Sequence, residues 1–159
     1  MRMDKLTNQL QTALADAQSL ALGKDHNFIE PVHLLSALLE QSGGACRPLL
    51  QKAGADIAAL VQRTKAAVEA LPTVSGTGGD IHMSNDLGRI LNVTDKLAQQ
   101  TGDTYISSEL VLLAMLESKT KAGELLQASG VKALERKGAI EMMRGGEEVD
   151  KPEAEESRQ

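Results

Sequence analysis

The chain has 159 residues, of which 42% are hydrophobic, enough for one globular domain with a core of its own. Aromatic residues make up only 1%, so Leu, Ala, Ile, Val and Met must fill that core, a composition that favours closely packed helices. The net charge of −5, the scarcity of aromatic rings and the lack of any Lys/Arg run longer than two residues argue against a nucleic-acid-binding protein.

The first half of the chain carries four segments in which apolar residues recur at helical spacing. Thr7 stands where an N-cap belongs, and its counterpart in the second half, Ser84, is another capping residue type. Pro31 fits the first turn of a helix, where its missing N–H costs nothing. A short loop is expected over 24–29, and the Gly-rich stretch 72–83 is predicted to be a linker. The helices predicted here cover 7–22, 31–41, 45–53 and 56–71.

The second half of the chain repeats the first. Residues 84–117 align with residues 7–40 at a constant shift of 77, with no gap across 34 positions. Because a repeat shapes the whole fold, the same plan is predicted again, with helices over 84–101, 107–118, 121–129 and 131–144.

The predicted fold is therefore all-α, with eight helices arranged as two four-helix repeats related by a pseudo-twofold axis. The repeats, over 1–71 and 84–145, form one domain spanning 1–145. Residues 146–159 are acidic with almost nothing to bury, and we expect them to be the disordered start of a linker.

Motifs for catalysis and for metal binding are missing from the sequence. The Gly-rich stretch lacks the Gly-Lys-Ser/Thr of a phosphate-binding loop, and no nucleophile elbow is present, so we expect a non-enzymatic chain. His26, His33 and His82 lack metal-ligand spacing and are expected to be surface or helix-end residues. Cys46, the one cysteine, is expected to be a small buried hydrophobe.

Nothing in the sequence suggests export or a membrane. The chain opens without a signal peptide, and the apolar run over 110–116 is too short to span a bilayer. The expectation is a soluble, cytoplasmic protein, monomeric as an isolated domain.

The two copies differ in polarity at a few aligned positions. Val93 replaces Asp16, and in the next helix Leu110 and Leu113 replace a histidine and a serine. Positions three apart share a helix face, so these extra apolar side chains, together with Leu97, suggest an exposed apolar groove. A slightly asymmetric core explains the same pattern equally well.

Several segments together resemble the N-terminal domain of Clp ATPases, and most closely that of the disaggregase branch. The resemblance covers essentially the whole chain. It rests on the repeat, on the acidic segment over 146–159, and on residues 1–7, 17–21, 26–35, 102–103, 106–110 and 143–146.

This resemblance implies a mobile eight-helix module that engages unfolded or aggregated polypeptides and passes them to the pore of a hexameric AAA+ chaperone. The ATP- and Mg-dependent modules, and the middle domain that works with the DnaK system, would lie outside this chain, leaving it without a cofactor. The alternative is the N-domain of a Clp protease ATPase, which docks folded adaptor proteins.

The resemblance also implies site residues. The family's polar substrate-binding positions match Thr7, Asp103 and Glu109, and its apolar groove matches Val93, Leu97 and Leu110. Each polar residue also has a structural reading: Thr7 as an N-cap, Asp103 as a turn former, and Glu109 as a carboxylate that favours the helix dipole in the first turn.

Overall fold

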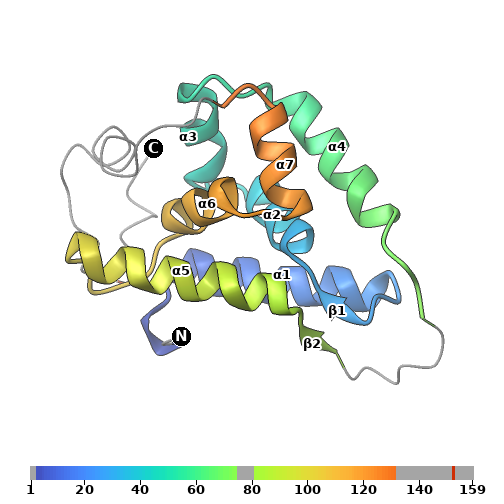
Figure 1. Cartoon of the computed structure of the whole chain (residues 1–159), viewed down its shortest axis with the longest axis horizontal. Helices are drawn as coiled ribbons and strands as arrows, with labels where there is room; N and C mark the ends of the chain where they lie inside the picture. Colours follow the sequence, from blue (N-terminus) through green and yellow to red (C-terminus); the bar gives the residue numbers. More distant parts are fainter. Residues whose placement is uncertain (1–2, 75–80, 132–151, 153–159) are drawn as a thin grey trace.

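The computed structural model describes residues 3–74, 81–131 and 152. The predicted eighth helix over 131–144 and the acidic segment over 146–159 lie outside the described residues, apart from the isolated positions 131 and 152. The other seven predicted helices are all present, so the all-α class is confirmed (Figure 1).

The described elements follow the order that the repeat predicts. A short 3-10 helix precedes the first repeat, and two-residue strands precede the second helix of the first repeat and the first helix of the second repeat. The elements are η1 (Met3–Lys5), α1 (Asn8–Gly23), β1 (Phe28–Ile29), α2 (Pro31–Glu40), α3 (Cys46–Lys52), α4 (Ile57–Glu69), β2 (His82–Met83), α5 (Asn85–Thr101), α6 (Ser108–Glu117) and α7 (Lys121–Ala128).

Local chemistry explains where the first helix of each repeat begins. The Thr7 hydroxyl accepts a hydrogen bond from the Leu10 N–H at 3.3 Å, and the Ser84 hydroxyl accepts one from the Leu87 N–H at 3.1 Å. Each satisfies one of the N–H groups that a helix start leaves without a partner. Both caps were predicted from the residue types, and they occupy aligned positions.

The second helix of each repeat forms the centre of the molecule. Every residue of α2 from Pro31 to Leu39 is buried, as is every residue of α6 from Ser108 to Met115. Helix α2 contacts every other described α-helix, and α6 contacts α2, α3, α5 and α7. A helix that is apolar on all sides must be enclosed in this way, so the two repeats share one core.

Two short backbone pairings join the repeats, and the sequence did not predict them. Strands β1 and β2 pair in parallel, with Ile29 opposite Met83, although both segments were expected to be loop or linker. The second pairing is a parallel bridge between Leu6 and Ile106. Two residues are too few for the alternating pattern that identifies a strand in a sequence.

These two pairings are equivalent under the internal repeat. Adding 77 to Leu6 gives Met83, and adding 77 to Ile29 gives Ile106, so each repeat's entry segment pairs with the other repeat. The Ser84 N–H donates to the Ile29 carbonyl at 3.0 Å, and the Thr7 N–H donates to the Ile106 carbonyl at 3.0 Å. We call these contacts the β1–β2 seam and the Leu6–Ile106 seam.

Candidate functional site

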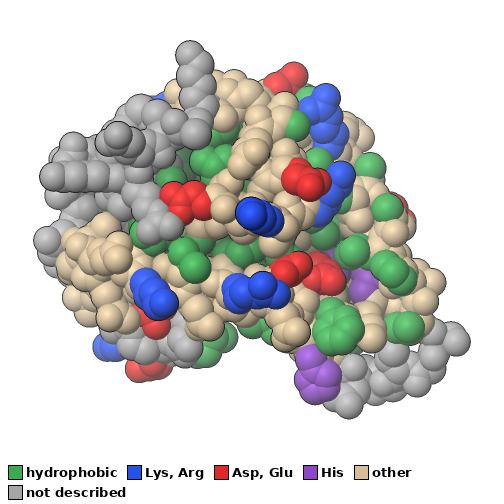
Figure 2. Space-filling model, in the orientation of Figure 1, with side chains coloured by type: hydrophobic (Ala, Val, Ile, Leu, Met, Phe, Trp, Pro, Cys, Tyr) green, Lys and Arg blue, Asp and Glu red, His purple; other side chains and the backbone are tan. Residues whose placement is uncertain are grey.

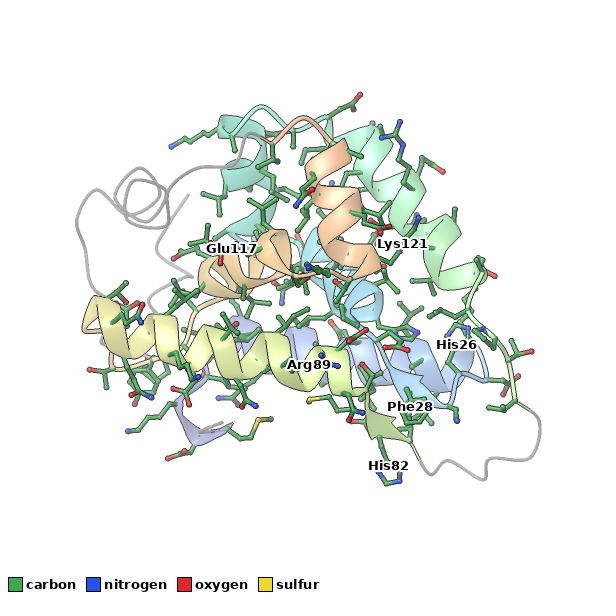
Figure 3. All side chains as sticks on the ribbon, in the orientation of Figure 1. His26, Phe28, His82, Arg89, Glu117 and Lys121 are labelled. Carbon is green, nitrogen blue, oxygen red and sulfur yellow. The ribbon has the colours of Figure 1, made fainter. Side chains whose placement is uncertain are left out.

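A hollow of about 340 Å³ lies between α5 and the end of α6. Its apolar lining comes from Ile90, Val93 and Ala114, which are spaced along two packed helices. In Figure 3, Arg89 on α5 and Glu117 at the end of α6 lie on either side of it. The remaining lining residues are polar or charged: Asp86, Ser118, Lys119 and Thr120.

Helix periodicity explains the apolar lining. Ile90 is buried and Val93, three residues later on the same face of α5, is only partly buried. Val93 therefore stands at the edge of the core, where one side of it packs inward and the other faces the hollow. Its partner position in the first repeat is Asp16, so the polarity difference between the copies does mark this surface.

The rim of the hollow carries charges of both signs. Arg89 and Asp86 form an ion pair at 3.3 Å between residues three apart, and both side chains are mostly exposed. Such exposed pairs contribute less than about 1 kcal/mol, so either partner can turn toward a ligand at little cost. The combination of an apolar floor and adaptable polar walls suits weak binding of many sequences.

The sequence predicted an exposed groove of Val93, Leu97, Leu110 and Leu113, and the structure does not contain it. Leu97, Leu110 and Leu113 are 2%, 0% and 4% exposed, and only Val93 among the four reaches the surface. Leu110 and Leu113 belong to the fully enclosed central helix α6, so the added apolar groups fill the core there. The asymmetric core, the alternative that the sequence left open, describes Leu110 and Leu113, and Leu97 is buried as its aligned residue type, Leu20, would suggest.

The three predicted polar residues gather near the Leu6–Ile106 seam, and all are buried. Thr7 is 0% exposed and binds Ile106 through its backbone, and Glu109 follows three residues later, in the first turn of α6. The Ser107 hydroxyl donates to the Glu109 carboxylate at 3.3 Å. These contacts place Thr7 and Glu109 at a joint between the repeats, away from the lining of the hollow.

Asp103 lies in the turn that connects α5 to α6. Its N–H donates to the Ala98 carbonyl at 2.9 Å, and the Thr101 hydroxyl donates to its carboxylate at 2.9 Å. Gly102 before it adopts a φ of 77°, a left-handed conformation that closes helix α5. The turn-forming role expected of Asp103 is thus present, and the side chain is 5% exposed.

Two histidines prove to be buried rather than on the surface. His26 is 4% exposed and His33 is 0% exposed, and the His26 Nδ1 atom lies 2.8 Å from the His33 Nε2 atom. The Glu30 N–H donates to His33 Nδ1 at 2.8 Å, so neutral His33 carries its proton on Nε2 and donates it to His26. His33 does sit at a helix end, as predicted, in the first turn of α2.

Burial and the neighbouring His26 lower the pKa of His33 from 6.5 to about 4.

Cys46 is 1% exposed, which confirms the prediction of a buried hydrophobe. Within residues 3–74, 81–131 and 152, no three His, Cys, Asp or Glu side chains are grouped so that they could hold a metal ion. In the same ranges, no helix has the length and apolar character needed to cross a bilayer.

Sequence reasoning missed most of the residues around the hollow. Arg89 and Lys119 are exposed charged residues, a type too common on surfaces to stand out, and Ala114 is one small residue within a long apolar run. Ile90 could be placed on the inner flank of its helix from periodicity, but not beside a hollow. Only Val93 carried a signal, the change in polarity between the copies.

Comparison with known proteins identifies the kind of domain. A model of the "Clp repeat (R) N-terminal domain" family matches residues 5–129. The chain is 53% identical to the chaperone protein ClpB of Pseudomonas putida and 48% identical to that of Vibrio cholerae, in each case over all 159 residues. It spans about a fifth of the length of these curated relatives, 19% in both cases.

Solved structures support the same fold. The N-terminal domain of Hsp104 from Candida albicans matches with a TM-score of 0.83 at 20% identity, covering 95% of this chain and 99% of that chain. The N-terminal domain of the ClpV1 ATPase from E. coli matches with a TM-score of 0.74 at 23% identity, covering 87% of this chain and 83% of that one. At these identities the likeness establishes the fold alone.

Proposed function

Because this chain belongs to the Clp repeat N-terminal domain family, we propose that it binds unfolded or aggregated polypeptides for a disaggregase chaperone. The hollow beside Val93 is the observation that carries this proposal. Its apolar lining contacts a side chain of the client polypeptide, and its charged groups contact the client backbone or the side chains next to it. Such a site favours extended, apolar segments without reading a particular sequence.

The proposal assigns the remaining chemistry to regions outside this chain. ATP and Mg binding, assembly of the parent hexamer and cooperation with the DnaK system belong to the other four-fifths of proteins like the ClpB relatives. The chain itself is proposed to be a cytoplasmic, non-catalytic and cofactor-free domain that is monomeric in isolation. Its proposed role is to hold a client polypeptide near the ATP-dependent modules that thread it.

The buried polar residues have a supporting role in this proposal. Thr7 bonds the Ile106 carbonyl at the Leu6–Ile106 seam, Asp103 closes the turn before α6, and Glu109 accepts from Ser107 at the start of α6. Helix α6 carries Ala114, which lines the hollow. Substitutions there would change client binding indirectly, through the position of α6. Leu97, Leu110 and Leu113 act in the same way, by filling the core beneath the site.

The experiment measures binding of a permanently unfolded protein, such as a reduced and carboxymethylated one, by fluorescence anisotropy. Replacing Val93 with Asp restores the polarity of the first repeat at this position. We expect Val93→Asp to weaken binding by about fivefold or more, because a charge replaces apolar contact area in the hollow.

Val61→Asp is the matched control, because Val61 is also partly buried but lies on α4, outside the lining of the hollow. Equal loss of binding in both variants, with both melting cooperatively, would overturn the assignment of the hollow. Tight stoichiometric binding of a folded protease adaptor, with no binding of unfolded protein by the unmodified chain, would favour the adaptor-docking alternative instead.

A further inference from the structure

The hollow beside Val93 has an equivalent place in the first repeat, between α1 and the end of α2, and there a side chain fills it. Gln41 follows α2 directly, and its Nε2 atom donates to the backbone carbonyl of Gln9 on α1 at 2.8 Å. A Cβ added at Gly44 would lie 3.0 Å from the Gln41 Cβ atom, so the loop after α2 covers this side chain closely. The first repeat therefore closes this place with a carboxamide of its own.

The second repeat has a similar backbone at this point but lacks the carboxamide. Ser118, which aligns with Gln41, follows α6 with a φ of −79° and a ψ of 153°, against −62° and 126° for Gln41. The Ser118 hydroxyl donates to the Met115 carbonyl at 2.6 Å, so it is turned back onto its own helix. The residue aligned with Gln41 is thus too short to fill the hollow, and its polar atom is already used.

The hydrogen-bond acceptor of the first repeat is retained in the second. Asp86 aligns with Gln9 and lines the hollow, and no side chain in the described ranges donates to its backbone carbonyl. A carbonyl oxygen has two lone pairs, so the bond it accepts within α5 leaves room for a second donor. The floor is also more apolar, because Ile90 and Val93 replace Ala13 and Asp16. An occupant therefore meets apolar groups and a backbone acceptor together.

The charges around the hollow favour a neutral occupant. Its lining contains two acidic residues, Asp86 and Glu117, and two basic residues, Arg89 and Lys119. Figure 2 shows side chains of both signs on this face, in the region where Figure 3 labels Arg89 and Glu117. A charged side chain entering the hollow meets a like charge as well as an opposite one, whereas a neutral polar group is repelled by neither.

We propose that the hollow prefers client segments that carry glutamine, and that the client carboxamide takes the place that Gln41 fills in the first repeat. Its N–H donates to the Asp86 carbonyl, and its methylene groups pack on Val93. Gln41 identifies this occupant, because it makes the same contact with the aligned carbonyl in the equivalent place. The inference rests on the proposed function and adds to it the class of client side chain that is bound.

The first experiment measures the binding of labelled, unstructured peptides to the full 159-residue chain by fluorescence anisotropy. One peptide repeats Gln, Ser and Leu, and the comparison peptide has Met in place of every Gln. Met is of similar length and more apolar, but it has no N–H donor. We expect the Gln peptide to bind about threefold to tenfold more tightly, the range that one hydrogen bond contributes. Equal or tighter binding of the Met peptide would overturn the inference.

The second experiment fills the hollow from within the protein. Ser118→Gln restores the residue of the first repeat at the end of α6, and the installed carboxamide competes with the client. We expect the Gln peptide to bind this variant about fivefold more weakly than the unmodified chain. Gly88→Gln is the matched control, because it also restores a glutamine of the first repeat, Gln11, but lies outside the lining of the hollow. It should leave binding of the Gln peptide unchanged.

The variants also separate this inference from the proposed function. Unchanged binding by a Ser118→Gln variant that melts cooperatively, or equal weakening by Ser118→Gln and Gly88→Gln, would overturn the inference. Loss of carboxymethylated-protein binding in Val93→Asp would still uphold the proposed function in that case. If Ser118→Gln failed to fold, the comparison of the Gln and Met peptides on the unmodified chain would decide. If the unmodified chain bound no unfolded polypeptide at all, both the inference and the proposed function would fail.

Discussion

At the scale of single residues, the two histidines give the first repeat a buried polar contact that the second repeat lacks. The positions of His26 and His33 are occupied in the second copy by Asp103 and Leu110. His33 accepts the Glu30 N–H on one ring nitrogen and donates to His26 from the other, so both of its nitrogens are used. A proton added to His33 removes its acceptor and places a charge in the core.

We therefore predict that the free energy of unfolding falls in mild acid. The folded state keeps His33 neutral because its pKa is about 4, while the unfolded chain takes up a proton below about pH 6.5. Protons thus favour the unfolded state, and stability present above pH 6.5 is lost as the pH falls toward 4, by about 2 kcal/mol at pH 4.5. Urea unfolding at a series of pH values measures this loss.

The control for this prediction is His33→Leu, which installs the residue found at the aligned position of the second repeat. Its stability should depend less on pH between 6.5 and 4.5, since the other titrating groups are unchanged. The same pH dependence in both proteins would contradict the assignment to His33.

At the scale of elements, the residues that follow the C-terminal ends of α3 and α7 show how the repeats meet. Gly54 and Gly130 follow these helices with φ of 96° and 97°, a conformation that side chains disfavour. A Cβ added at Gly130 would lie 3.2 Å from the Gly54 carbonyl oxygen. The sequence predicted helices that end at 53 and 129, directly before these glycines, but not that the two glycines face each other.

We predict that Gly130→Ala destabilises the chain by about 1–2 kcal/mol, through both backbone strain and the close approach to Gly54. Gly88→Ala is the comparison, because Gly88 lies within α5 and an added Cβ there meets nothing within 4 Å. That change should stabilise the chain by about 0.5–1 kcal/mol. Thermal and urea melts measure both, and a destabilised Gly88→Ala variant would show that α5 does not tolerate the added methyl.

At the scale of the whole molecule, each repeat depends on the other. The entry segment of one repeat pairs with the second-helix entry of the other, and α2 contacts helices of both repeats. Because the core is shared, we expect the described domain to unfold as one cooperative unit rather than as two halves.

The unequal seams give a test of this arrangement with aligned residues. We predict that Leu6→Ala lowers the free energy of unfolding by about 3 kcal/mol, because it removes a side chain that is 1% exposed where the repeats join. Met83→Ala, its repeat partner, should cost less than about 1 kcal/mol at 37% exposure. Similar losses in the two variants would mean that the seams are equally packed.

The sequence by itself determined the helices, because caps, glycines and apolar spacing act over a few residues and the repeat supplied these signals twice. It predicted seven helices that are present, the caps Thr7 and Ser84, and the buried Cys46. For the candidate site it marked Val93, through the change in polarity from Asp16 in the first repeat.

Only the tertiary structure decided which apolar residues are enclosed and which are open. Leu110 and Met83 are comparable apolar residues in the sequence, yet one lies in a central helix and the other at an open seam. Exposure depends on which distant segments pack together, and here those segments are contributed by the other repeat. The two seams arise from such contacts between the repeats, whereas the hollow arises from the packing of α5 against α6 within the second repeat.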